Sequence, residues 1–219
     1  MVKFEDPRTW PKLDAIGGTV ELSPALILHA YRHGVFPMPF APGLIGWFSP
    51  MRRGILPLDG LRVSRSLRKS AKRYRLTVDQ AFGQVLARCA DPARPHGWID
   101  EAIARNYAEL HHAGIVHSVE AWDAEGRLCG GLYGVNMGGL FAGESMFHDP
   151  VHGRDASKAA LIGLVDLLTA DGVGGRLLDV QWRTDHLASL GVIEVPRDRY
   201  LELLSAALEL PAPEWVVPD

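Results

Sequence analysis

The sequence is poor in cysteine and has no long apolar segment. Its two cysteines, Cys89 and Cys129, lack the Cys-x-x-Cys spacing of zinc and redox sites, so we expect two buried, reduced thiols. No apolar run reaches the roughly 18 residues of a membrane span, and the opening residues MVKFEDPRTWPK lack the apolar core of a signal peptide. These absences predict a cytoplasmic protein that contacts no membrane.

Metal-binding patterns are absent as well. The nine histidines include no His-Glu-x-x-His pattern. His111, His112 and His117 are close in sequence, but a helix end followed by a strand explains this spacing more simply than a metal cluster does. The sequence therefore predicts no metal and no cofactor.

Acidic residues are missing from one basic segment. The 219-residue chain is 47% hydrophobic with a net charge of −3, yet residues 62–75 contain seven of its 23 basic residues and no acid. If this segment is helical, one of its faces carries Arg65, Lys69, Lys72 and Arg73. Charge runs are usually solvated helix faces, but the lack of any compensating acid favours a polyanionic partner, such as a nucleic-acid backbone.

Capping residues, among them Ser23, Thr77 and Asp100, and hydrophobic periodicity predict a mixture of helices and strands. We expect helices within residues 23–34, 77–90, 100–114, 155–172 and 198–208, and strands at 115–122, 127–137, 139–147 and 176–182. The first three strands would form an antiparallel meander. Residues 35–57, dense in proline and glycine, are expected to be a loop with short extended pieces at a domain junction. This order predicts an α+β fold with a mixed sheet.

Two polar residues interrupt the predicted strand at 176–182. Asp179 and Gln181 are two positions apart, so on a strand both side chains point to the same face. Burying a carboxylate and an amide together is costly unless both find partners. From these residues alone, an internal hydrogen-bonded network or a water-exposed face explains the pair as well as a reaction site does.

A series of short motifs covers nearly the whole chain, from about Gly17 to Leu204. In order, they are AYRHGVFP, WFSP, SRSLRK, YRLTVDQAF, HGWID, LHHAG, HSVEAW, GGLYGV, FAGESMF, ASKAAL, LDVQ, HLASLG and VPRDRYL. Their number, order and spacing resemble those of the leucyl/phenylalanyl-tRNA-protein transferases. The resemblance implies a small N-terminal domain over residues 1–56. It also implies a GNAT-like (acyl-CoA N-acyltransferase) domain over residues 57–219, with a mixed, largely antiparallel sheet flanked by helices.

The resemblance also implies an activity. Leu or Phe would pass from aminoacyl-tRNA to the α-amino group of a protein with N-terminal Arg or Lys, which marks that protein for degradation by the N-end rule. The enzyme would act as a monomer. Because an aminoacyl ester is already activated, transfer needs alignment, removal of a proton from the amine and stabilisation of charge on the carbonyl oxygen.

Roles in the reaction follow from motif positions. By resemblance, Asp179 orients the amine and accepts its proton, and Gln181 positions the amine or the ester. Glu144 holds the cationic end of the acceptor, although such an acid is more often part of a structural ion pair or a capped turn.

Binding roles follow in the same way, although ordinary core packing would give the same sequence at the apolar and aromatic positions. The implied aminoacyl pocket is formed by Leu132, Phe141, Met146, Leu161 and Leu178. One methylene changes affinity there by only about 1–3 kcal/mol, so Met is expected as an additional donor residue. Contacts with the terminal nucleotide are implied for Tyr31, Trp98 and Tyr107. The acceptor stem of the tRNA would bind Arg65, Lys69, Lys72 and Arg73.

The chain departs from the family pattern at two places near the implied site. Met38 replaces a tryptophan expected near the tRNA 3′ end, and the connection over residues 148–154 is longer than usual and precedes Asp155, where asparagine is common. These departures leave open a catalytically impaired RNA- or peptide-binding module of the same fold. An acyl-CoA donor is disfavoured because no Gln/Arg-x-x-Gly-x-Gly/Ala loop leads into a helix.

Overall fold

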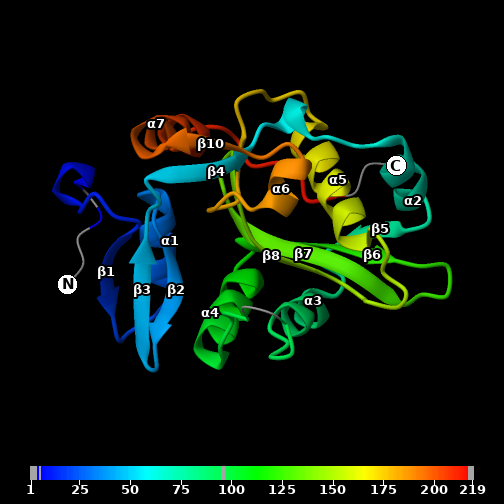
Figure 1. Ribbon diagram of the computed structural model, residues 1–219, viewed down its shortest axis with the longest axis horizontal. Helices are drawn as coiled ribbons and strands as arrows, with labels where there is room; N and C mark the ends of the chain where they lie inside the picture. The colour runs from blue at the N-terminus through cyan, green and yellow to red at the C-terminus, as the bar shows by residue number, and fades with distance from the viewer. Residues whose placement is uncertain (1–3, 5, 95–96, 217–219) are drawn as a thin grey trace.

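Strands form two sheets in this computed structural model, which describes residues 4, 6–94 and 97–216 (Figure 1). The small antiparallel sheet has the order β1-β3-β2, and its strands are β1 (Ala15–Thr19), β2 (Phe36–Ala41) and β3 (Leu44–Phe48). The large sheet has the order β10-β4-β9-β8-β7-β6-β5. Its strands are β4 (Arg52–Leu56), β5 (Arg75–Val78), β6 (Val116–Trp122), β7 (Leu128–Met137), β8 (Leu140–His148), β9 (Leu177–Asp179) and β10 (Ile193–Pro196). Of the described strand pairs, only β8 and β9 are parallel.

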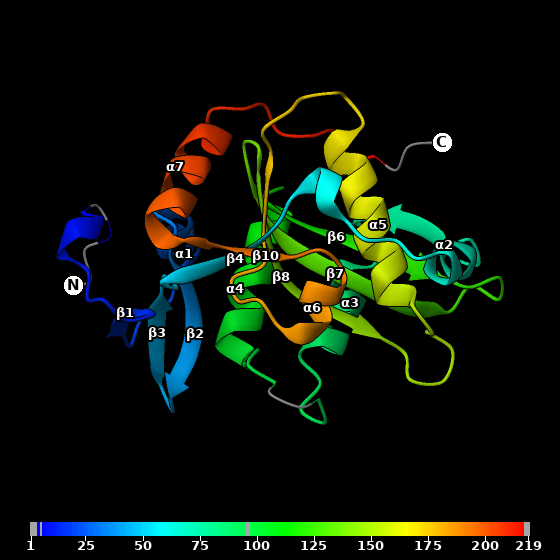
Figure 2. The same cartoon turned by 45° about the horizontal axis from the view of Figure 1, so that its top comes forward.

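Helices cover both faces of the large sheet (Figures 1 and 2). They are α1 (Pro24–Arg32), α2 (Arg65–Ala71), α3 (Phe82–Cys89), α4 (Glu101–His112), α5 (Ala156–Thr169), α6 (Asp185–Ser189) and α7 (Arg197–Leu208), with 3-10 turns at Pro7–Thr9 and Leu58–Gly60. Helix α5 packs on one face of β6 and β7, and α3 and α4 lie on the opposite face. The predicted α+β class, with a mixed, largely antiparallel sheet flanked by helices, is confirmed.

Strand β7 is buried on both faces. Leu132 belongs to the apolar cluster under α5, and its neighbour Tyr133 belongs to the cluster formed with α3 and α4. A strand that is covered on both sides is expected to be a nearly continuous apolar run, as the LCGGLYGV segment is. Gly130 permits the close approach of α5, because a Cβ atom there would lie 2.6 Å from the Cβ of Ala156.

Several local predictions are confirmed. Ser23 caps α1 by accepting a hydrogen bond from the Leu26 amide at 3.2 Å, and Gly34 follows the helix with φ of +76°. Asp100 caps α4 in the same way through the Ile103 amide at 2.8 Å. The meander of β6, β7 and β8 is antiparallel as expected, and both cysteines are free and buried.

Two predicted segments differ from the structure in their extent. The helix expected over 77–90 begins at Phe82, because Thr77 pairs with Glu120 in β5 and β6 and its hydroxyl donates to that carboxylate. The basic segment 62–75 is helical only over Arg65–Ala71, and the chain then turns into β5. Residues 35–57 contain β2, β3 and β4 rather than mainly loop.

The domain boundary between residues 56 and 57 stays a prediction. Strand β4 lies on the N-terminal side of that boundary, yet it pairs with β9 and β10 inside the large sheet. None of the described helices is both long and apolar enough to cross a membrane.

Candidate active site

A cavity of about 350 Å³ is lined by residues of β4, β7, β8, β9, α5 and α6. Most of its wall is apolar. All five residues predicted for an aminoacyl pocket contribute to this wall: Leu132, Phe141, Met146, Leu161 and Leu178. The polar lining residues are Arg94, Glu144, Ser145, Gln181, Thr184 and His186. The cavity can therefore enclose an apolar side chain and present polar groups to the atoms attached to it.

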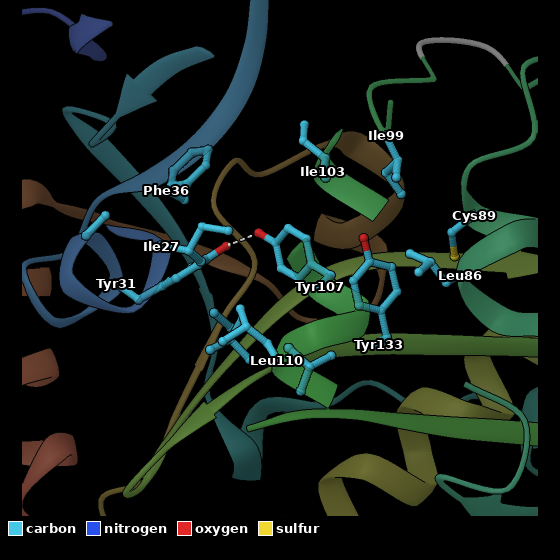
Figure 3. Packing of buried hydrophobic residues seen from close by; sticks show 14 of the residues in the cluster. Ile27, Tyr31, Phe36, Leu86, Cys89, Ile99, Ile103, Tyr107, Leu110 and Tyr133 are labelled. Carbon is cyan, nitrogen blue, oxygen red and sulfur yellow. Dashed lines mark hydrogen bonds between the residues drawn. The ribbon is translucent and has the colours of Figure 1, made fainter. Parts of the chain in front are cut away.

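Glu144, on β8, is held by two tyrosines from helices distant in sequence. The hydroxyl of Tyr31, from α1, lies 2.5 Å from Glu144 Oε1, and the hydroxyl of Tyr107, from α4, lies 3.0 Å from Oε2. The two hydroxyls are also 2.9 Å apart, and Figure 3 shows them pointing toward each other from the two helices. The α1–α4 contact thus fixes the carboxylate at the cavity wall.

Burial raises the pKa of Glu144 to about 7, and the nearby charge of Asp179 acts in the same direction. Hydrogen bonds from Tyr31 and Tyr107 and the charge of Arg53 oppose this rise. Glu144 is half-buried and faces the cavity. Its carboxyl group therefore changes protonation close to neutral pH.

Asp179 ends β9 and is completely buried in an ion pair with Arg53 of β4. Arg53 Nε and Nη2 donate to the two carboxylate oxygens at 2.7 and 2.5 Å. The Tyr200 hydroxyl donates to Oδ2 at 2.9 Å, and the backbone N–H of Gln181 donates to Oδ1 at 2.9 Å. Asp179 is therefore the centre of a closed polar network, and it is not among the residues that line the cavity.

Gln181 reaches the cavity from a turn. The expectation that it shares a strand face with Asp179 is wrong, because β9 ends at Asp179 and Gln181 has φ of +59°. The turn rests on Gly54, whose amide donates to the Gln181 carbonyl at 2.8 Å and whose missing side chain leaves room for the backbone of Trp182. The side-chain nitrogen of Gln181 is buried without a hydrogen-bond partner. No described residue uses this donor.

The residues predicted to contact the terminal nucleotide lie outside the cavity wall. Tyr31 and Tyr107 are completely buried, and their hydroxyls bind Glu144 instead of an open surface. Trp98 is half-buried and packs against the same core cluster. Met38 is also half-buried there, whereas Phe40 near the tip of the β2–β3 hairpin is 66% exposed.

The predicted basic residues are all exposed. Arg65 and Lys69 lie on α2, and Lys72 and Arg73 follow it. Helix α2 packs against α5, whose other residues line the cavity, so the basic segment and the cavity lie on either side of α5. The longer 148–154 connection is tied to this segment, because the Tyr74 hydroxyl donates to the Arg154 carbonyl at 2.7 Å.

Sequence reasoning missed several polar residues of the site. Arg53 and Tyr200 bind Asp179 from 126 and 21 positions away, and Arg94 and His186 line the cavity. Arg53 directly precedes the apolar stretch GILPL. A charge in a buried strand requires a partner, so this position could have been recognised from the sequence. No pattern in the sequence marks the other three.

No group of three or more histidine, cysteine or acidic side chains within the described residues could hold a metal ion. The cavity instead combines an apolar wall with the carboxylate of Glu144 and the side-chain amide of Gln181. This combination suits a reaction that selects an apolar side chain and rearranges polar bonds beside it.

The fold, the cavity and the relatives together define an aminoacyltransferase. A family model described as "Leucyl/phenylalanyl-tRNA protein transferase" matches residues 55–205, and a model described as its N-terminal domain matches residues 20–51. The chain belongs to the leucyl/phenylalanyl-tRNA protein transferase family.

Individual relatives agree with this assignment. The chain is 47% identical over 205 residues to a leucyl/phenylalanyl-tRNA–protein transferase of Afipia carboxidovorans, with 90% of this chain and 87% of that protein covered. It is 52% identical over 193 residues to a protein of the same name from Rhizorhabdus wittichii, covering 85% and 75% of the two chains. Among solved structures, L-PGS from Bacillus licheniformis aligns with a TM-score of 0.41 at 14% identity, over 71% of this chain and 51% of that chain.

Proposed function

We propose that this chain transfers Leu or Phe, and also Met, from aminoacyl-tRNA to proteins that begin with Arg or Lys, marking them for degradation by the N-end rule. The observation that carries the proposal is the apolar cavity whose polar lining includes Glu144 and Gln181. Its five predicted wall residues support selection of an apolar side chain, whereas the two polar groups lie where an ester and an amine would meet.

The donor end of the reaction is assigned to the cavity and Gln181. Gln181 lines the cavity, and rotation of its side-chain amide brings the unpartnered nitrogen to the ester carbonyl oxygen, to which it donates as negative charge develops there. Asp179 acts through Gln181, because its carboxylate accepts a hydrogen bond from the backbone N–H of Gln181 at 2.9 Å and is itself paired with Arg53. Its complete burial supports this positioning role better than direct proton transfer from the acceptor amine.

The acceptor end is assigned to Glu144. A carboxylate on the cavity wall attracts the cationic N-terminal end of an Arg or Lys peptide, and the two tyrosine hydroxyls keep it in place. The cost of removing a charged peptide end from water is offset by this pairing. An acceptor that begins with alanine lacks the second charge and is used less well.

The tRNA is assigned to the exposed basic segment around α2. No acidic residue lies in segment 62–75. The acceptor stem would bind there through its phosphates, which contact Arg65, Lys69, Lys72 and Arg73. Burial of Tyr31 and Tyr107 favours a supporting role for these tyrosines beneath Glu144 over direct stacking on the terminal nucleotide, which leaves Trp98 as the aromatic candidate for that contact.

The reaction needs no cofactor, and a monomer in the cytoplasm, where aminoacyl-tRNA is made, would carry it out. We propose two domains as well, with the GNAT-like catalytic domain beginning at β4 rather than at residue 57. The pairing of β4 with β9 and β10 supports this boundary, as does the gap between the two family matches at residues 51 and 55.

The test is incubation with labelled Leu-tRNA or Phe-tRNA and peptides that begin with Arg, Lys or Ala. We expect labelled Arg and Lys peptides, little labelled Ala peptide and no acetylation when acetyl-CoA replaces the tRNA. Tight binding of the tRNA and the Arg peptide without transfer would instead support the impaired binding module.

A further inference from the structure

Three oxygen-bearing side chains form a closed set beside the cavity: Tyr31, Tyr107 and Glu144. Each of the three pairs is within hydrogen-bonding distance, at 2.5, 3.0 and 2.9 Å. When Glu144 is ionised, the two hydroxyls supply two protons for these three contacts. A protonated Glu144 supplies the third proton and completes a ring of three hydrogen bonds. The arrangement therefore accommodates Glu144 in both protonation states.

Glu144 is also the acid that a substrate can reach. It is the only carboxylate among the described residues that line the cavity, and Gln181 lies on the same wall. Tyr31 and Tyr107 are completely buried behind it, and Asp179 is sealed in its pairing with Arg53. Each carboxylate oxygen of Glu144 has a second lone pair available beyond its tyrosine partner.

We propose that Glu144 takes the proton from the attacking amine and returns it to the ribose oxygen that leaves. This assignment rests on the proposed function and adds a chemical role to acceptor binding. The neutral amine nitrogen attacks the ester carbonyl carbon, a C–N bond forms, and the C–O bond to the ribose breaks. The proton moves from nitrogen to Glu144 and then to the departing oxygen, which leaves as a hydroxyl. Glu144 returns to its ionised form, and no other reactant is consumed.

The electrostatic surroundings suit this exchange. A general base works best when its pKa lies near the working pH, and burial raises the pKa of Glu144 to about 7. An α-amino group has a pKa of about 7.7–8.0, so amine and base are closely matched before the bond forms. The titratable and charged groups around Glu144 and on its cavity wall are Tyr31, Arg53, Arg94, Tyr107, Tyr133, Asp179 and His186.

The first test separates proton transfer from acceptor binding. Single-turnover transfer from bound Phe-tRNA is measured at saturating Arg peptide for the unchanged protein, Glu144→Gln and the exposed control Glu109→Gln on α4. We expect Glu144→Gln to lose at least about 100-fold in the rate at saturating acceptor, in addition to the higher acceptor KM that follows from loss of the charge that binds the peptide. The control should keep both values. A Glu144→Gln protein that keeps its saturated rate and shows only a raised KM overturns the proton-transfer role.

The second test supplies a substitute for the missing group. In Glu144→Ala, added formate can occupy the vacated space, so we expect the rate to rise at least about tenfold with formate, whereas the unchanged protein should not respond. A folded Glu144→Ala protein whose rate is insensitive to formate overturns the inference. If the unchanged protein transfers nothing to any peptide, the proposed function itself is wrong, which is a separate and distinguishable outcome.

Discussion

Asp179 and Glu144 are carboxylates on the neighbouring parallel strands β9 and β8, but their surroundings differ. Asp179 is completely buried and joined to the Arg53 guanidinium by two hydrogen bonds. Glu144 receives hydrogen bonds from two neutral hydroxyls and faces the cavity. A carboxylate with a fixed counter-charge holds geometry, whereas one held by neutral donors keeps the freedom to gain and lose a proton near neutral pH.

The largest expected effect concerns the Arg53–Asp179 pair. Arg53→Met leaves the Asp179 charge buried without its partner, so we expect the free energy of unfolding to fall by about 3–5 kcal/mol. Arg52→Met is the matched control, because Arg52 is exposed and contacts Glu194 at 3.3 Å on the surface, where such pairs contribute about 0–1 kcal/mol. Urea titrations measure both. Equal losses would mean that the buried pair does not hold the site together.

Asp179→Asn tests whether this network acts on the reaction through Gln181. Asparagine keeps one acceptor for the Gln181 backbone amide but leaves the buried Arg53 without a counter-charge, so we expect a stability loss of about 3–5 kcal/mol here too. We also expect the transfer rate to drop at least about tenfold while circular dichroism stays native. Single-turnover assays at saturating acceptor check this, and an unchanged rate would remove Asp179 from the positioning of the site.

Glu144→Gln should have the opposite effect on stability. The pKa of Glu144 is about 7 in the folded protein against an ordinary value of 4.5, so its ionised form destabilises the folded state as the pH rises through this window. Removing the charge should therefore stabilise the protein by about 1–3 kcal/mol at pH 8 and by much less at pH 5. Thermal unfolding at both values tests this, with Glu109→Gln as the control. A uniform change at both pH values would contradict the role of ionisation.

Tyr107→Phe should shift the pH dependence of transfer by a smaller amount. The Tyr107 hydroxyl stabilises the ionised Glu144, so its removal raises the pKa of Glu144 further, by roughly half to one unit for a hydrogen bond of about 1 kcal/mol. The acid limb of the rate profile should move to higher pH by that amount. The profile is measured with peptide adjusted to a constant concentration of neutral amine.

Tyr133→Phe is the control for this shift. The Tyr133 ring packs edge-on against Tyr107 with centroids 5.7 Å apart, but its hydroxyl has no hydrogen-bond partner. The Tyr133→Phe limb should therefore stay in place. Equal shifts in both variants would point to repacking of the aromatic cluster rather than to loss of the hydrogen bond to Glu144.

The smallest effect is expected at the basic segment, far from both carboxylates. Replacing Lys69 and Lys72 by alanine should lower the slope of log affinity against log salt for tRNA by roughly 1.4–1.8, because each phosphate contact contributes about 0.7–0.9. Arg199→Ala on α7 is the control, since Arg199 is engaged with Glu202 at 2.7 Å. Filter binding at several salt concentrations measures the slopes, and an unchanged slope in the double variant would exclude these lysines from the interface.

Local sequence chemistry predicted the parts of the fold that depend on neighbouring residues. Ser23 and Asp100 cap their helices as the patterns indicate, and β6, β7 and β8 form the expected antiparallel meander. Thr77 misled the prediction because its hydroxyl serves Glu120 across the β5–β6 pair instead of a helix end. A strand partner 43 positions away leaves no trace in a local pattern.

The candidate site was predictable in its residue types but not in its connections. Asp179 and Gln181 were singled out from one short segment, yet their geometry depends on β4, which brings Arg53 to the carboxylate and Gly54 beneath the turn. The motif containing Glu144 likewise gives no indication that Tyr31 and Tyr107 hold its carboxylate. These contacts arise only when α1, α4 and β8 meet in three dimensions.

The left-handed backbone at Gln181 has a consequence for sequence choice. A residue with a Cβ atom pays roughly 1–2 kcal/mol to adopt such a conformation, and glycine would relieve that strain. Gln181→Gly should therefore raise the free energy of unfolding and lower the rate of transfer. Selection for thermal tolerance alone would favour glycine at this position, so retention of glutamine under such selection would reveal a demand for catalysis.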